Sequence, residues 1–276
     1  MEHFECSMHH TLFIMQKLLI LLVLATACAQ PQWQPDATID LGDVTPIGIA
    51  EQDGNFWLAD GDHNQLVVID RAGEVQRTLK GFERPMHLAS DGAAVYVPEY
   101  GSDAIVVVGQ QGRDVLPIPD SLDAPAGVHL LGDEIAIADF YNHRILYFDG
   151  SDWTSFGNEG HDFGQLYYPT DVHLTTDRIY VADAYNNRIQ IFDKTGKPLR
   201  TMGEDAGMNA ATGIHVADGE VFITDFENDR VLIFGTDGTL RQTLTELGKP
   251  TDLLVSDGNL YITNYRGRSL QRFRKN

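Results

Sequence analysis

The sequence predicts an all-β protein built as a six-bladed β-propeller, and three observations support this prediction. A segment of about forty residues recurs six times, which is the usual length of a four-stranded propeller blade. Within each copy, apolar and polar residues alternate between turns such as Asp-Gly, as antiparallel strands require. The last copy has no fourth strand of its own, and residues 37–42 resemble the missing strand.

The composition excludes several classes of protein. Of the 276 residues, 43% are hydrophobic, which is enough to fill a core and disfavours intrinsic disorder. The 20 Lys and Arg residues against 40 Asp and Glu residues give a formal charge of −20. A nucleic-acid partner is therefore not expected, because affinity for phosphate backbones comes mostly from clustered Lys and Arg. The cysteines are Cys6 and Cys28, so the body of the chain has neither a disulfide framework nor a Cys-rich zinc module.

Residues 1–28 are expected to form an export signal. Lys17 precedes an apolar run over residues 18–27, which is too short to span a membrane but has the length of a signal-peptide core. Three small residues, 25–27, stand directly before Cys28. This arrangement resembles a bacterial lipoprotein processing site, which implies that Cys28 becomes lipidated. Ordinary signal-peptidase cleavage at the same place is the alternative.

The predicted signal also indicates where in the cell the protein is located. A lipid on Cys28 would attach the exported protein to a membrane through its N-terminus alone. Ala29 follows the cysteine, where lipoproteins retained at the inner membrane carry Asp, so the periplasmic face of the outer membrane is expected in a Gram-negative source. Residues 29–36 are interpreted as a tether, and residues 37–276 as the propeller.

Each repeat has the same expected order of elements. The copies start near residues 46, 85, 125, 169, 211 and 250 with a short inner strand. A second strand ends in an acidic or amide residue, a third is apolar, and most copies add a Gly-containing turn and a more polar fourth strand. We expect residues 37–42 to complete the sixth blade, because an open ring would expose unpaired strand edges. No helix is expected after residue 30.

The best copies carry a recognisable pattern. Residues 180–189 read Tyr-Val-Ala-Asp-Ala-Tyr-Asn-Asn-Arg-Ile, and residues 137–145 and 223–231 repeat its Asp, Asn and Arg positions. The pattern resembles the NHL-repeat family of β-propellers, and the resemblance covers residues 37–276. It implies the fold, whereas members of that family range from enzymes to protein-binding platforms, so it leaves the function open.

A ring of polar residues ends the second strands and is expected to lie toward one mouth of the central channel. It consists of Asp60, Glu99, Asp139, Asp183, Asp225 and Asn264. These residues are candidates for ligand binding, but the favoured interpretation is that each caps turn amides or pairs with an Arg such as Arg144. Tyr141 and Tyr185 occupy the adjoining mouth loops and are interpreted as contact residues.

A second candidate site lies two positions after the start of each repeat. Glycine alternates there with a polar residue, in the order Gly48, His87, Gly127, Asp171, Gly213 and Asp252. If these side chains point into the channel, His87, Asp171 and Asp252 stand at near three-fold spacing. One imidazole and two carboxylates suit a polar ligand or one divalent cation, Ca²⁺ or Zn²⁺. Capping of the inner strands by the two Asp residues is the alternative.

Three histidines share another repeat position, four residues after the start. They are His129, His173 and His215, in three consecutive copies. They are either a zinc-binding set or buried side chains bonded between neighbouring blades. The second interpretation is favoured, because mid-strand side chains of a propeller are expected to face the next blade.

The expected function is recognition by a monomer whose channel mouth binds a protein partner or a small polar ligand. No nucleophile–base pair and no hydrolase motif is visible in the sequence, so an enzyme is the less favoured class. The alternative function is a metal-dependent lyase or hydrolase with its site at His87, Asp171 and Asp252.

Overall fold

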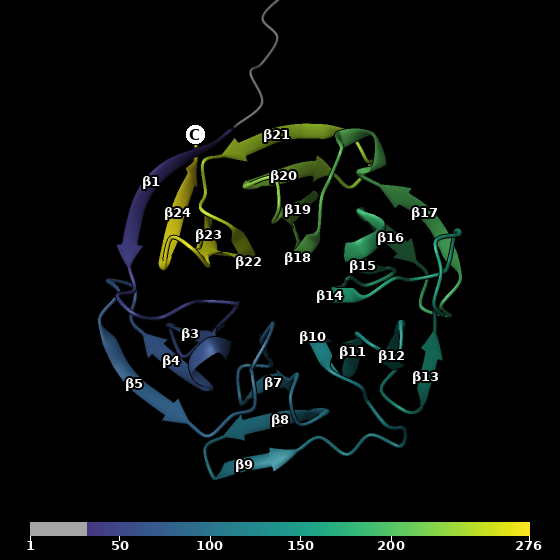
Figure 1. The fold of residues 1–276 in the computed structure, drawn as a ribbon, viewed down its shortest axis with the longest axis horizontal. Coiled ribbons are helices and arrows are strands. Elements are labelled where there is room, and N and C mark those ends of the chain that lie inside the picture. The colour runs from purple at the N-terminus through teal and green to yellow at the C-terminus, as the bar shows by residue number, and fades with distance from the viewer. Residues whose placement is uncertain (1–31) are drawn as a thin grey trace, which may run out of the picture. The chain divides into compact units, whose positions relative to one another are not determined.

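A ring of six antiparallel sheets surrounds a central channel (Figure 1). The computed structural model describes residues 32–276. The predicted signal peptide with Cys28, and residues 29–31 of the predicted tether, lie outside the described residues. Each sheet has four strands, so the predicted six-bladed, all-β architecture is confirmed. No helix within residues 32–276 has both the length and the apolar character that crossing a membrane demands.

The strands run outward from the channel in chain order in five blades, and in the sixth the N-terminal strand β1 lies outermost. The inner strands are β2 (Gly48–Gln52), β6 (Ala89–Ser90), β10 (Pro125–Leu131), β14 (Pro169–Leu174), β18 (Ala211–Ala217) and β22 (Pro250–Ser256). The second strands are β3 (Asn55–Asp60), β7 (Val95–Glu99), β11 (Glu134–Asp139), β15 (Ile179–Asp183), β19 (Glu220–Asp225) and β23 (Asn259–Asn264). The third strands are β4 (Gln65–Ile69), β8 (Ala104–Gly109), β12 (Arg144–Phe148), β16 (Arg188–Phe192), β20 (Arg230–Gly235) and β24 (Ser269–Lys275). The outer strands are β5 (Val75–Lys80), β9 (Gly112–Val115), β13 (Trp153–Phe156), β17 (Pro198–Met202), β21 (Leu240–Thr245) and β1 (Trp33–Asp40).

The N-terminal strand closes the ring, as predicted. Strand β1 pairs with β24 from Trp33 opposite Lys275 to Asp40 opposite Ser269, and Figure 1 shows it outside the last blade. The strand begins four residues earlier than residue 37, so residues 33–36 belong to the sheet and not to the tether. The sequence pattern missed this because Pro35 suggests irregular structure, whereas an edge strand tolerates proline where the register shifts, here between Pro35 and Ala37.

Trp33 anchors β1 to the fifth blade as well. Its side chain is only 3% exposed and packs edge-to-face on Phe222 with ring centroids 5.7 Å apart. Its indole N–H donates to a carboxylate oxygen of Glu220 at 3.1 Å, and Lys275 donates to the same oxygen at 2.8 Å. The start of the strand is therefore held by apolar contacts and by a buried charged acceptor.

Neighbouring blades share their hydrophobic cores. One cluster joins Trp57 and Val68 of the first blade to Val95 and Val97 of the second, and the other clusters likewise combine residues of adjacent blades. A blade therefore cannot bury its apolar faces without both neighbours.

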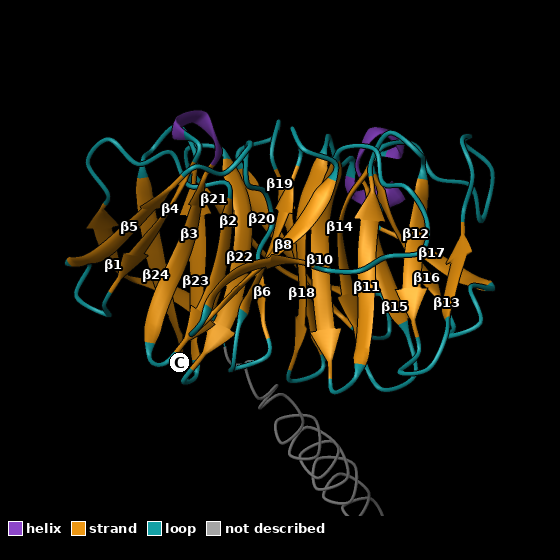
Figure 2. Ribbon diagram, turned by 90° about the horizontal axis from the view of Figure 1, so that it is seen from below, coloured by secondary structure: helices purple, strands orange, loops and turns teal. Residues whose placement is uncertain are grey.

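Residues 32–276 contain three single 3₁₀ turns, although no helix was expected after residue 30. They cover Gly61–His63, Ala184–Asn186 and Glu204–Ala206 and lie on one face of the ring, which is the mouth formed by the loops between second and third strands (Figure 2). We call this face the mouth below.

Candidate functional site

The polar residues that end the second strands are buried, and the five acidic ones are bonded within their own blades. Asp183 accepts hydrogen bonds from the Tyr167 amide at 2.7 Å, from Asn186 at 2.9 Å and from the Arg188 Nε–H at 2.9 Å. Asp139 and Asp225 have the equivalent three partners. This geometry favours the structural interpretation, because the carboxylates are already engaged by amides and by a guanidinium.

The first, second and sixth blades differ from this pattern. Asp60 accepts from Thr45, His63 and Gln65, and Glu99 accepts from the Glu83 amide at 3.1 Å and from Ser102. In the sixth blade, Asn264 is fully buried and neither atom of its amide has a hydrogen-bond partner.

A second set of bonds joins each blade to the next, and the sequence analysis did not identify it. Asn187 has a left-handed backbone, with φ of 55°, and its side chain accepts the Ala210 amide of the following blade at 2.9 Å. The same bond recurs at Asn64, Asp103, His143 and Asp229. The available signal was the Asn, Asp or His four residues after the acidic residue, since these types tolerate a left-handed backbone.

Aromatic side chains gather on one side of the mouth. This aromatic patch consists of Tyr100, Phe140, Tyr141, Tyr167, Tyr168 and Tyr185, with ring centroids 4.6 to 6.4 Å apart between neighbours. Tyr141 is 46% exposed and Tyr185 is 60% exposed, and the hydroxyls of Tyr100 and Tyr141 lie 2.6 Å apart. Burial and the neighbouring Tyr141 raise the pKa of Tyr100 above its ordinary value. The patch thus presents two tyrosine rings to solvent.

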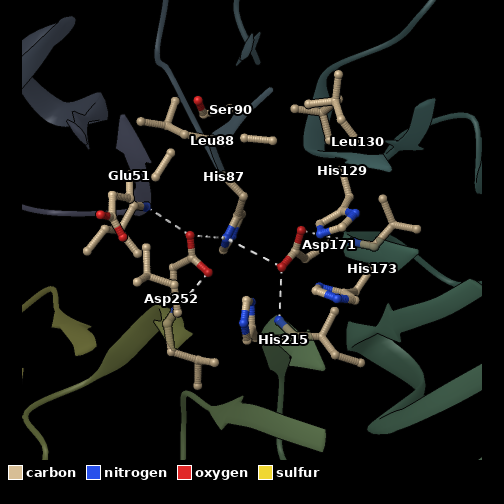
Figure 3. A pocket seen from close by; sticks show the side chains of 18 of the residues that line it. Glu51, His87, Leu88, Ser90, His129, Leu130, Asp171, His173, His215 and Asp252 are labelled. Atoms are coloured by element: carbon tan, nitrogen blue, oxygen red, sulfur yellow. Dashed lines mark hydrogen bonds and ion pairs between the residues drawn. The ribbon is translucent and has the colours of Figure 1, made fainter. Parts of the chain in front are cut away.

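His87, Asp171 and Asp252 come together inside the channel (Figure 3). Each is 3–5% exposed, and one ligand-type atom from each lies within 4.8 Å of the others. His87 Nδ1 is 3.5 Å from Asp252 Oδ2 and 4.0 Å from Asp171 Oδ2. Within residues 32–276, no other His, Cys, Asp or Glu residues form such a group of three. We call these residues the channel triad.

The alternating glycines explain how three side chains fit at this level. A Cβ on Gly127 would lie 2.8 Å from the Asp171 Cα, and one on Gly48 would lie 2.2 Å from the Met86 carbonyl oxygen. Side chains at every blade would therefore clash with the adjacent inner strand. Glycine in alternate blades lets the strands approach closely and leaves the axis to the other three residues.

Both Asp residues of the triad also bond to inner strands. Asp252 accepts the Leu253 amide at 2.8 Å and the Ile49 amide of the first blade at 2.9 Å. Asp171 has the same arrangement with Val172 and with Ile214 of the next blade. The capping alternative therefore accounts for the carboxylates. It does not account for His87 Nδ1, which is buried without a hydrogen-bond partner.

Two residues of the triad have pKa values above their ordinary range. Burial raises the pKa of Asp171 to about 7, with His87 opposing the shift and Asp252 adding to it. For His87, burial lowers the pKa, but the attraction of Asp252 and Asp171 outweighs burial and leaves the pKa above its usual value. A bound divalent cation would displace these protons, since metal ligands must be deprotonated.

The triad's dimensions fit such a cation. Two edges of the triangle are 3.5 and 4.0 Å long and the third is at most 4.8 Å, so its centre lies roughly 2.0–2.4 Å from the corners, near the bond lengths of zinc to nitrogen and oxygen. One imidazole and two carboxylates would leave at least one coordination position open.

A cavity of about 200 Å³ adjoins the triad and is lined by the inner strands of all six blades. It extends past His129, His173 and His215 to Glu51 and Ser90, and so toward the hairpin turns on the face opposite the mouth. None of the aromatic-patch residues lines it. The two candidate sites expected from the sequence, one at the mouth and one in the channel, are therefore separate features of the structure.

The three histidines line this cavity, although they were expected to face the neighbouring blade. Ring centroids are 3.9 Å apart between His129 and His173, and 4.9 Å between His173 and His215. The Leu174 amide of the next blade donates to His129 Nδ1 at 3.2 Å, so the expected bond between blades is present for this ring. Burial lowers the pKa of His129 to about 3 and of His215 to about 4.

Comparison with known proteins identifies the repeat. The NHL repeat family matches residues 166–192, the segment that contains Asp183 and Arg188. The chain is a six-bladed β-propeller that contains an NHL repeat. No curated protein sequence matches it significantly.

Solved structures resemble this propeller in fold. A catalytically inactive virginiamycin B lyase from Staphylococcus aureus, solved with quinupristin, is 17% identical with a TM-score of 0.65, covering 88% of each chain. A gluconolactonase from Xanthomonas campestris is 16% identical with a TM-score of 0.73, covering 91% of this chain and 96% of its own. These identities are too low to carry an activity across, and the likeness is one of architecture.

The matched repeat allows a direct test of the bonds within blades. Replacing Arg188 by Ala should lower the free energy of unfolding by about 3 kcal/mol, because it leaves the buried Asp183 without its charged partner. Urea unfolding measures the change. Arg178→Ala is the control in the same blade, since its ion pair with Asp177 is exposed, and it should change stability by less than about 0.5 kcal/mol. Equal effects of the two variants would contradict this role of Arg188.

Proposed function

We propose that this propeller is a recognition module whose aromatic patch binds a protein partner or a small polar ligand. The observation that carries the proposal is the exposure of Tyr141 and Tyr185 within a cluster of six touching rings. Tyrosine offers a large contact area with a polar tip and few rotatable bonds, which suits binding surfaces. Exposed apolar patches of this kind mark interaction sites.

The proposal includes a cellular setting. The protein acts as an exported monomer, lipidated at Cys28 and held at the periplasmic face of the outer membrane if the source is Gram-negative. The apolar run before Cys28 and the small residues beside it support this setting. Mass spectrometry of the mature N-terminus tests it, since lipid on Cys28 and simple cleavage give different masses.

The binding proposal is tested with two matched double variants. Tyr141→Ala with Tyr185→Ala removes the exposed rings, whereas Val75→Ala with Val115→Ala removes equally exposed apolar side chains from outer strands. Partners captured from an extract of the source cells are quantified with each protein. We expect at least tenfold less of a specific partner on the Tyr variant, unchanged capture by the Val variant, and binding that persists in chelator. Undiminished capture by the Tyr variant would contradict the proposal.

A second candidate function, a metal-dependent lyase or hydrolase, is favoured by one feature of the channel triad. His87 Nδ1 is buried without a partner and faces two carboxylates at distances too long for good hydrogen bonds. A divalent cation, Ca²⁺ or Zn²⁺, would satisfy all three groups. When bound, it would supply Lewis-acid polarisation of a substrate oxygen. His87, Asp171 and Asp252 would hold it, and the inner strands would exclude bulk water.

Metal analysis of purified protein tests this candidate. We expect about one equivalent of metal in the unaltered protein, at least tenfold less in His87→Ala, and no change in His161→Ala, where the histidine is exposed at the mouth. Hydrolysis of gluconolactone, the substrate class named for one structural neighbour, is assayed with and without chelator. Equal metal content in the unaltered protein and His87→Ala would exclude the triad as the metal site.

A further inference from the structure

The channel cavity has one polar wall that the channel triad leaves unused. His129, His173 and His215 project from three consecutive blades at one level, and we call them the imidazole arc. The other three blades place Ala50, Ala89 and Leu254 at the equivalent position. The cavity beside the triad is therefore polar on one side and apolar on the other.

The backbone sets the tautomer of one ring of the arc. His129 Nδ1 accepts the Leu174 amide, so the proton of this neutral ring is on Nε2. His173 Nδ1 is buried without a hydrogen-bond partner. His129 thus turns its acceptor nitrogen to the neighbouring blade and keeps Nε2–H as a donor.

We propose that the cavity binds a small carboxylate, which bridges a cation on the channel triad and the imidazole arc. This inference rests on the cation site of the second candidate function. The triad and the arc line the same space, so a ligand in the cavity would lie beside a cation held by the triad. A volume of about 200 Å³ equals the share of roughly six or seven liquid waters, which limits the ligand to a few heavy atoms.

The chemistry of the walls selects the ligand class. A cation and the N–H donors of the arc each bind an atom that offers a lone pair. A carboxylate has two such oxygens, so one can bind the cation while the other accepts from an imidazole N–H. Glu51, which also lines the cavity, is paired with Arg71. The apolar side formed by Ala50, Ala89 and Leu254 suits the short alkyl part of the ligand.

Cobalt-loaded full-length protein tests the inference, because the visible absorption of Co²⁺ reports its ligands. Acetate is titrated against acetamide, which has the same shape without the charge. We expect acetate to shift the cobalt spectrum saturably and acetamide to require at least tenfold higher concentration. His173→Phe and His215→Phe preserve ring volume and should keep bound Co²⁺ while weakening acetate binding at least tenfold; His215→Gln repeats the test at the more accessible ring.

The outcomes separate the two claims. Failure of the unaltered protein to bind Co²⁺ would overturn both the cation site and the carboxylate site. Bound Co²⁺ with a spectrum indifferent to acetate, equally sensitive to acetamide, or unaffected in its acetate response by the histidine variants would overturn the carboxylate site alone.

Discussion

Deletion of residues 32–40 should abolish cooperative folding of the propeller. Strand β1 supplies the outer edge of the last blade through seven paired residues, and its Trp33 joins the cluster that holds the fifth and sixth blades together. Without it, β24 becomes an exposed edge strand and the apolar surface beneath Trp33 meets water. We expect aggregation or loss of the sigmoidal urea transition, and an unchanged midpoint would contradict this topology.

A point substitution gives a graded form of the same experiment. Trp33→Ala should lower the free energy of unfolding by about 3–5 kcal/mol, since it removes a buried aromatic side chain and leaves Glu220 without its indole donor. Gln34→Ala is the control, because Gln34 lies next to Trp33 on the same strand but is exposed. It should change stability by less than about 0.5 kcal/mol.

The ring could be predicted because its information is periodic and local. Turn residues, alternation and the acidic ends of second strands recur at fixed offsets, and one missing strand near residue 270 has one matching segment near residue 40. The start of β1 could not be placed from local pattern. Burial of Trp33 against Phe222 decides it, and that contact joins residues almost two hundred positions apart.

In the candidate site too, the features that depend on repeat position could be predicted and the others could not. The convergence of His87, Asp171 and Asp252 followed from their shared repeat position, because equal positions lie at equal height around a ring. Only part of the aromatic patch could be predicted from the sequence. Tyr141 lies after a second strand and Tyr168 before an inner strand, so no single repeat position contains both. The cavity beside the triad depends on which side chains are small in all six blades together, which no one repeat shows.

Acid should destabilise the metal-free propeller steeply between pH 6.5 and pH 4.5. Burial lowers the pKa of His129 to about 3 and of His215 to about 4, and that of His173 well below its ordinary value. These groups are neutral when folded but gain protons near pH 6.5 when unfolded. The unfolded chain therefore binds more protons in this range, and stability falls as the pH falls.

Two groups of the channel triad act in the opposite direction, and the balance decides the sign. Asp171, with its pKa raised to about 7, binds its proton more readily when folded, so it alone would make stability fall as the pH rises from about 4 to 7. The raised pKa of His87 acts in the same sense, but only above pH 6.5. Three imidazoles with lowered pKa values are opposed by one carboxyl with a raised pKa. The unfolded chain therefore binds at most about two more protons than the folded protein. The free energy of unfolding then changes by about 2.7 kcal/mol per pH unit at most.

Urea unfolding in chelator at pH 7.0, 5.5 and 4.5 measures this dependence. The charges that face the arc are Lys194 near His129, and Asp252 and Asp218 near His215; the two carboxylates favour protonation of His215, so its contribution is the smallest of the three. Replacing His173 by Phe removes one titrating ring and should reduce the slope by up to about half, because one of two net protons is lost. His161→Ala, at an exposed histidine, should leave the slope unchanged. A midpoint that stays constant from pH 7.0 to pH 4.5 would show that the arc titrates as freely in the folded protein as in the unfolded chain, and water would then have to reach all three rings.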